Sequence, residues 1–206
     1  MSEDIFAHKR KSYIEIGEVF FWTATINQWQ KLLLQDEYKN VIIDSLEHLS
    51  NSGKIDVYAF VIMPNHIHLI FKTNELNGKE TAQASFLKFT AHKFRQMLLQ
   101  EGDSRLSSYK VDAENKKHEF WQRDSLAIHL YSREVAFQKL KYVHNNPLAE
   151  HWQLAKHPCD YKYSSARYYE LNEKNFSLER FVERDMKSKC LKIPNGRGTF
   201  TTELNS

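Results

Sequence analysis

Two histidines separated by one residue are the side chains in this sequence whose types and spacing most directly suggest chemistry. His66 and His68 follow a predicted turn at Met63-Pro64-Asn65, because proline cannot donate to a β ladder and asparagine tolerates turn geometry. Side chains alternate between the two faces of a strand, so a strand starting at His66 places both imidazoles on one face. The pair could hold a metal ion. The ordinary alternative is that both are polar residues on a half-exposed sheet.

A tyrosine and an asparagine further along the chain could complete such a site. The segment 133–146 is predicted to be a helix, capped by Ser132, from its apolar stripe of Ala136, Leu140 and Val143. Tyr142 and Asn146 lie off this stripe and are four residues apart, so they are neighbours on one helix face. This face would present a nucleophilic hydroxyl beside a ligand oxygen. Alternatively, Tyr142 packs its ring locally and Asn146 helps to cap the helix.

The remaining elements must position these residues. Strands are predicted at 18–26, 55–62, 66–72 and 118–130, and two further helices at 37–49 and 82–100. The order β-α-β-β-α-β predicts a ferredoxin-like α+β fold, an antiparallel sheet with two helices on one face, to which the tyrosine-bearing helix is added. This domain is expected to span 17–170, between a leader at 1–16 and a C-terminal extension at 171–206.

Three local predictions accompany this scheme. In the helix at 82–100, which is predicted to be amphipathic, one side is expected to carry Phe86, Phe89, Lys93 and Met97. Trp29 is expected to tuck inward from the connector after the first strand. The polar segment 102–117 is expected to be a loop.

Composition narrows the class of protein. The chain has 206 residues, 41% of them hydrophobic and 27% charged, which suits one folded domain. A formal net charge of +3 permits a nucleic-acid partner without arguing for one. The sequence has no apolar run of the roughly 18 residues that cross a membrane, and no secretory signal pattern at its start. Cys159 and Cys190 lack metal-site or disulfide-framework spacing, so a cytoplasmic location is expected.

The ordered motifs resemble one family. The segment 63–70, with its His-Ile-His core, resembles the His-hydrophobic-His motif of single-tyrosine transposases, the REP-associated tyrosine transposases and their insertion-sequence relatives. The segment 142–147, Tyr-Val-His-Asn-Asn-Pro, resembles the nucleophile helix of that family. Further matching blocks are Lys88 to Thr90, Phe120 to Gln122 and Asp160 to Ala166, so the resemblance covers about 18–170. Leu148 to Trp152 departs from the family, which often has a small residue and glycine there.

The resemblance implies an enzyme that cuts and rejoins single-stranded DNA through a covalent 5′-phosphotyrosine. Tyr142 would be the nucleophile, and His66, His68 and Asn146 the metal ligands. Mixed imidazole and amide ligands suit Mg²⁺ or Mn²⁺. His144 points elsewhere on the helix, so no general base is assigned.

The implied partner is DNA. Relatives recognise hairpins and flanking single strands, and some are dimers that exchange the tyrosine helix, so both a monomer and a homodimer stay open. Candidate phosphate contacts are Lys88, Lys93, Arg95, Arg123, Lys139 and Lys141. Candidate stacking aromatics are Trp121, Tyr131 and Tyr168. Taken singly, a helix lysine is more often a solvated surface residue, and a tryptophan is more often core.

Two other classes of function are compatible with the same residues. One is a catalytically silent, domesticated nucleic-acid-binding protein of the same fold. The other is a metal-dependent hydrolase that uses water in place of Tyr142. The presence of Tyr142 together with His66 and His68 favours retained strand-transfer chemistry.

Overall fold

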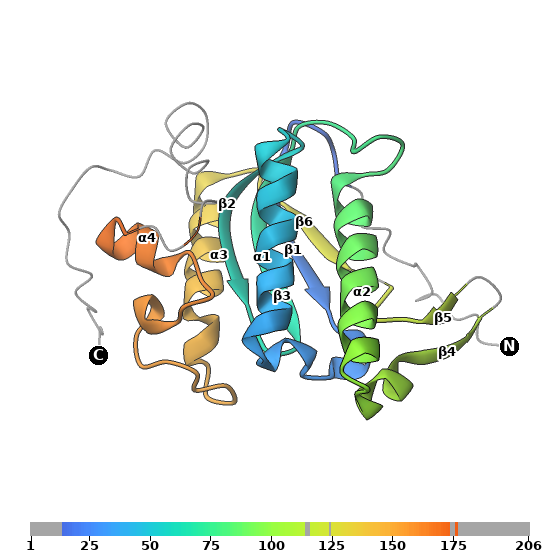
Figure 1. Ribbon diagram of the computed structural model, residues 1–206. Helices are drawn as coiled ribbons and strands as arrows, with labels where there is room; N and C mark the ends of the chain where they lie inside the picture. Colours follow the sequence, from blue (N-terminus) through green and yellow to red (C-terminus); the bar gives the residue numbers. More distant parts are fainter. Residues whose placement is uncertain (1–13, 114–115, 124, 174–175, 177–206) are drawn as a thin grey trace, which may run out of the picture.

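A four-stranded antiparallel sheet is the centre of the computed structural model, which describes residues 14–113, 116–123, 125–173 and 176 (Figure 1). The strand order is β2-β3-β1-β6. The strands are β1 Val19–Thr25, β2 Ile55–Ile62, β3 His66–Thr73 and β6 Leu126–His129. With β6 as the fourth strand of the motif, this is the ferredoxin-like arrangement, and the predicted α+β fold class is confirmed.

Two helices cover one face of the sheet. Figure 1 shows α1 (Asp36–Asn51) and α2 (Ala82–Gln100) running side by side across it. Alternation along β1 explains the two faces, because Phe20 and Trp22 pack in the core beneath these helices while Phe21 joins a separate core on the other side. The helices predicted at 37–49 and 82–100 are therefore confirmed in position and in the face they cover.

The buried side of α2 differs from the prediction. Phe86, Phe94 and Leu98 are buried, whereas Phe89 is 46% exposed. The buried positions recur every four residues and include Thr90, whose hydroxyl donates to the Phe86 carbonyl at 2.8 Å. A hydroxyl satisfied by its own helix can be buried without an unpaired polar group, so this residue gave no apolar signal although it faces the core.

The helix that carries Tyr142 covers the opposite face of the sheet. This helix, α3, spans Arg133–Asn145, and the Ser132 side chain caps it by accepting from the Val135 backbone N–H at 3.3 Å. The predicted stripe is confirmed, since the buried apolar residues of α3 are Ala136, Leu140 and Val143. They pack in a core with residues of β1, β2 and β3.

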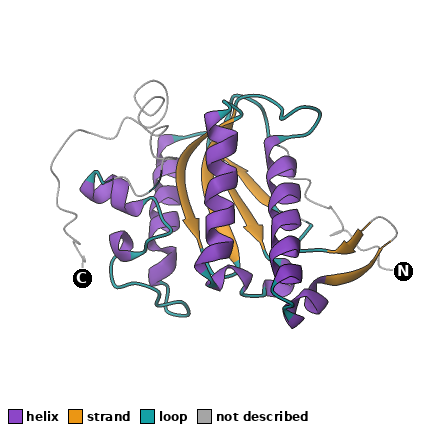
Figure 2. Ribbon diagram, viewed as in Figure 1, coloured by secondary structure: helices purple, strands orange, loops and turns teal. Residues whose placement is uncertain are grey.

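The region between α2 and α3 is more ordered than predicted. In place of a loop at 102–117, the chain forms the 3₁₀ helix η3 (Ser104–Tyr109) and a hairpin of β4 (Lys110–Ala113) and β5 (Lys116–His118). Figure 2 shows this hairpin standing away from the main sheet. The predicted strand at 118–130 contracts to β6, because Phe120 and Trp121 enter the core instead of continuing a strand.

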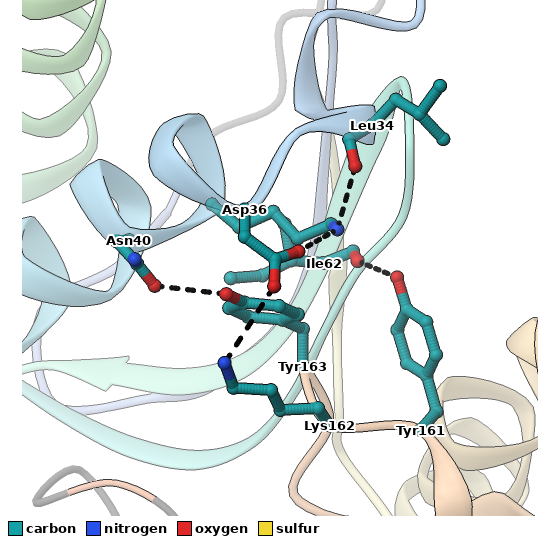
Figure 3. Close-up of polar contacts among 8 residues, drawn as sticks. Leu34, Asp36, Asn40, Ile62, Tyr161, Lys162 and Tyr163 are labelled. Atoms are coloured by element: carbon teal, nitrogen blue, oxygen red, sulfur yellow. Dashed lines mark hydrogen bonds and ion pairs between the residues drawn. The ribbon is translucent and has the colours of Figure 1, made fainter.

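A segment after α3 secures the end of β2. It lies between the 3₁₀ helix η5 (Pro158–Asp160) and the short helix α4 (Ala166–Leu171). Figure 3 shows the Tyr161 hydroxyl donating to the Ile62 carbonyl at 2.8 Å and the Tyr163 hydroxyl donating to Asn40 Oδ1 at 3.1 Å. The Ile62 backbone N–H donates to the Tyr163 carbonyl at 2.9 Å. These bonds hold β2 against α1 immediately before the turn that leads to His66.

The predicted leader and C-terminal extension lie almost entirely outside the described residues. Among the helices that the structure describes, none is long and apolar enough to cross a membrane.

Candidate functional site

The two histidines share one face of β3, as the spacing predicts. Their ring centroids are 4.6 Å apart, and both side chains are buried. Across the strand pair, His68 lies opposite Thr23 and His66 lies opposite Thr25. Ile67 packs in the core on the other face.

Hydrogen bonds set the tautomer of each imidazole. Asn65 donates its amide N–H to the Trp29 carbonyl at 3.2 Å, which leaves its Oδ1 to accept from His66 Nδ1 at 2.7 Å. His66 therefore has its lone pair on Nε2. His68 Nε2 lies 3.3 Å from Asn146 Nδ2 and His68 Nδ1 lies 2.8 Å from Thr23 Oγ1, an arrangement that likewise places the proton on Nδ1. Such outer partners orient metal-binding histidines.

Burial keeps both rings neutral. Loss of solvation lowers the pKa of His66 to about 4, although a hydrogen bond with Asn146 opposes this shift. Burial, with the positive charge of His66 and Lys139, lowers the pKa of His68 to about 3. At neutral pH both side chains are thus in the form that donates a lone pair to a metal ion.

Asn146 and Tyr142 reach this histidine pair from the end of α3. Asn146 begins the 3₁₀ helix η4 (Asn146–Leu148), where Pro147 follows it, and its side chain is buried. The Tyr142 side chain is 48% exposed, and its ring centroid lies 5.1 Å from that of His68. It also makes an edge contact with Phe21, with centroids 5.8 Å apart. The two distant segments therefore meet within one chain.

The ligand set fits a divalent metal ion. Asn146 Oδ1 is buried without a hydrogen-bond partner, which is costly for an amide oxygen unless some other group binds it. In the arrangement described above, Asn146 Nδ2 faces His68 Nε2. Turning the Asn146 amide over would place Oδ1 there instead and would give, with Nε2 of His66 and of His68, a nitrogen, nitrogen, oxygen set. Within the described part of the chain, no cluster of three His, Cys, Asp or Glu side chains could hold a metal, and the third side chain beside the two histidines is the amide of Asn146. Such a mixed set suits Mg²⁺ or Mn²⁺, whereas structural zinc sites use cysteine and histidine side chains.

A pocket of about 1000 Å³ opens over these residues. Lys139 and Lys141 line it, and none of the described residues that line it is acidic. Lys139 Nζ lies 4.9 Å from the Phe21 ring centroid and 5.7 Å from the Tyr142 ring centroid. The pocket therefore combines an exposed phenol with positive charge, which suits a phosphodiester.

Other predicted contacts lie elsewhere. Lys88, Lys93 and Arg95 belong to α2, on the opposite side of the sheet, and the Lys88 ammonium pairs with Glu80 at 2.8 Å. Arg123 is paired with Glu119 at 3.0 Å and does not line the pocket. The exposed Tyr131 and the partly buried Tyr168 do not line it either.

The prediction that Trp121 stacks on an unpaired base is wrong. Its side chain is only 6% exposed, and its indole N–H donates to Thr90 Oγ1 at 3.0 Å inside the core. A ring buried against Phe86 and Phe94 cannot stack on a base, so Trp121 is a structural residue.

The structure adds residues that the sequence did not single out. Thr23 and Asn65 orient the histidines, and Trp152 lies beside His66 with ring centroids 6.0 Å apart. Trp29, predicted to tuck inward, is instead 61% exposed at the rim of the pocket. Of these residues, only Asn65 could have been recognised from the sequence as part of the site, because it directly precedes the first histidine.

The fold has counterparts among solved structures. The chain is similar to a REP-associated tyrosine transposase bound to a REP hairpin, with 17% sequence identity, a TM-score of 0.55, and coverage of 87% of this chain and 90% of that one. A weaker likeness, to a proposed transposase from Deinococcus radiodurans R1, has 12% identity, a TM-score of 0.41, and coverage of 66% of this chain and 96% of that one. No protein-family model and no curated protein matches the chain. The chain has the fold of the REP-associated tyrosine transposase that it resembles.

Proposed function

We propose that this protein is a transposase that cleaves and rejoins single-stranded DNA through a covalent bond between Tyr142 and a 5′ phosphate. The observation that carries the proposal is the position of Tyr142, whose half-exposed ring lies 5.1 Å from the ring of His68 at the pocket. A buried tyrosine, or histidines aimed into the core, would have been incompatible with it.

The proposed reaction is a balanced exchange of two phosphorus–oxygen bonds. The Tyr142 oxygen attacks the scissile phosphorus, the bond from phosphorus to the 3′ oxygen breaks, and the phosphate stays on Tyr142. The phenol proton leaves to water at the open rim of the pocket, and the departing 3′ oxygen takes up a proton. A free 3′-hydroxyl later reverses these steps without an external energy source, because one phosphodiester link replaces another and none is hydrolysed.

Residues of this chain would provide the electrostatic part of catalysis. Lys139 lies 5.7 Å from the Tyr142 ring centroid and would attract the phosphate to the nucleophile. His66, His68 and Asn146 would hold Mg²⁺ or Mn²⁺, which supplies positive charge that polarises the scissile phosphate. Thr23 and Asn65 would keep both imidazoles in the orientation that binds the ion.

The proposed partner is DNA with an unpaired segment. The similar transposase is bound to a REP hairpin, which supports a hairpin with a flanking single strand as the substrate class. In this chain Tyr142 lies beside the histidines of the same subunit, which supports cleavage without exchange of α3 between subunits.

The test is the formation of a covalent adduct. Protein would be mixed with Mn²⁺ and single-stranded DNA of randomised sequence carrying a 3′ label, because the 5′ phosphate of the labelled fragment would remain on the protein. We expect a labelled band under denaturing conditions for the wild type and for Tyr131→Phe, which alters an exposed tyrosine outside the pocket. Tyr142→Phe should abolish the band while DNA binding is retained, because only the nucleophilic oxygen is removed.

An adduct that persists in Tyr142→Phe would refute the assignment of the nucleophile. Binding without any adduct in the wild type would favour the catalytically silent alternative. Cleavage that releases both fragments from the protein, with no trapped tyrosine, would favour the hydrolase.

A further inference from the structure

Two tryptophans flank the His66 end of the pocket. The Trp29 ring centroid lies 6.5 Å from that of His66, and the Trp152 ring centroid lies 6.0 Å from it. The other two tryptophans of the chain, Trp22 and Trp121, are buried. Trp29, by contrast, is 61% exposed and lines the pocket, so its indole face is open to a bound group.

The backbone that presents Trp29 is strained. Gln28 and Trp29 have φ angles of 54° and 57°, in the left-handed region that side chains other than glycine rarely adopt. Two such residues in succession persist only where surrounding structure holds them. Here the Trp29 N–H donates to the Ile26 carbonyl at 3.0 Å, and the Trp29 carbonyl accepts from Asn65 at 3.2 Å. The backbone position from which the indole projects is thus fixed by the fold.

Asn65 couples this indole to the proposed metal site. The same side chain that holds the Trp29 carbonyl accepts the hydrogen bond from His66 Nδ1 at 2.7 Å. A group stacked on Trp29 would therefore be held in a fixed relation to the ligand His66. Such a connection is expected when a base must be placed relative to a reacting phosphate.

A positive charge beside this end of the pocket suits a nucleotide. Lys31 Nζ lies 5.8 Å from the Trp152 ring centroid, and His151 packs beside the same ring at 5.4 Å. As stated above, none of the described residues lining the pocket is acidic. Aromatic platforms with adjacent cations are the recurring way in which proteins hold unpaired bases and their phosphates.

We propose that Trp29 and Trp152 form a stacking subsite for an unpaired DNA base next to the scissile phosphate, with Lys31 contacting the backbone phosphate of that nucleotide. The inference rests on the proposed function in that it names how the single strand is positioned there. It assigns the recognition of the unpaired strand to indole faces at the His66 end, and the chemistry to Tyr142 at the His68 end.

The experiment measures binding of labelled oligothymidine, and of the same oligonucleotide with abasic sites in place of the bases. Trp29→Ala should bind oligothymidine about 10-fold more weakly than the wild type, since a stacked base is lost, and Trp29→Phe should restore most of the affinity. The wild type and Trp29→Ala should bind the abasic strand equally, because it has no base to stack. Phe89→Ala, which removes an exposed ring on the opposite side of the sheet, should bind like the wild type.

Intrinsic fluorescence gives a second readout. Because Trp22 and Trp121 are buried, quenching by oligothymidine reports on Trp29 and Trp152. We expect quenching in the wild type and a clear decrease of it in Trp29→Ala. Since Trp29 is mostly exposed, its truncation should leave the protein folded; Trp152, which packs against the core, is tested second.

The outcomes separate the subsite from the proposed reaction. Equal binding of oligothymidine by Trp29→Ala and the wild type, or an equal loss of affinity for the abasic strand, would overturn the subsite even if the adduct of Tyr142 forms. Base-dependent binding through Trp29 without any adduct would support the subsite and refute the cleavage reaction.

Discussion

His144 allows a quantitative test of how the tyrosine helix is held. This residue lies two positions after Tyr142 on α3 but faces the core, where its Nε2 is hydrogen-bonded to Ser165 Oγ at 3.0 Å. Ser165 Oγ also accepts from the Phe60 backbone N–H at 3.0 Å, so the pair connects α3 to β2. Burial lowers the pKa of His144 from its ordinary 6.5 to about 4.

The sign of the pH effect follows from this shift. Above the ordinary pKa of 6.5, His144 is neutral in both the folded and the unfolded chain, and its contribution to stability is fully present. As the pH falls from 6.5 towards 4, the unfolded chain binds a proton that the folded chain does not, so the free energy of unfolding decreases; below about 4 no further loss comes from this group. At pH 5 the loss from this one group is about 2 kcal/mol.

The assay is urea unfolding at pH 7 and pH 5, with a chelator present, of the wild type and of His144→Gln. His66 and His68 titrate in both proteins, so the difference between the two acid-induced losses isolates His144. We expect the wild type to lose about 2 kcal/mol more than the variant. Equal losses in the two proteins would show that His144 is not buried as described, and that α3 is held in another way.

Two further predictions concern the proposed metal site. Mn²⁺ at about 100 times its dissociation constant should stabilise the wild type by about 2.7 kcal/mol, seen as a rise in Tm of roughly 5–11 °C. Asn146→Ala should show a smaller rise because the unpaired Oδ1 is removed, whereas Asn145→Ala, at an exposed neighbour, should behave like the wild type; equal shifts in all three would exclude Asn146 as a ligand. Thr23→Val should weaken Mn²⁺ binding by about 10- to 100-fold in a metal titration, because His68 loses the 2.8 Å partner that orients it, and unchanged affinity would contradict that role.

Local sequence patterns were sufficient to predict each half of the site, the histidine pair on β3 and Tyr142 on α3. Alternation along a strand places His66 and His68 together whatever the rest of the chain does, and the helical stripe of α3 turns Tyr142 away from the core by the same local geometry. The order of strands and helices predicted the sheet, since the ferredoxin-like arrangement is one of few ways to bury these faces.

Local patterns could not predict whether an aromatic side chain is buried or exposed where both environments were plausible. Trp29 and Trp121 are the same residue type in equally irregular segments, yet one is exposed at the pocket and the other is buried beneath α2. Phe89 and Phe94 likewise offer two apolar sides of α2, and only packing against the sheet selects one of them.

The sequence by itself determined which side chains share a face, because that depends on the repeat of a single strand or helix. Only the tertiary structure decided that α3 brings Tyr142 within 5.1 Å of the His68 ring, and that Asn65 joins Trp29 to His66. Contacts between segments far apart in the chain depend on how whole elements pack, and no local repeat encodes that packing.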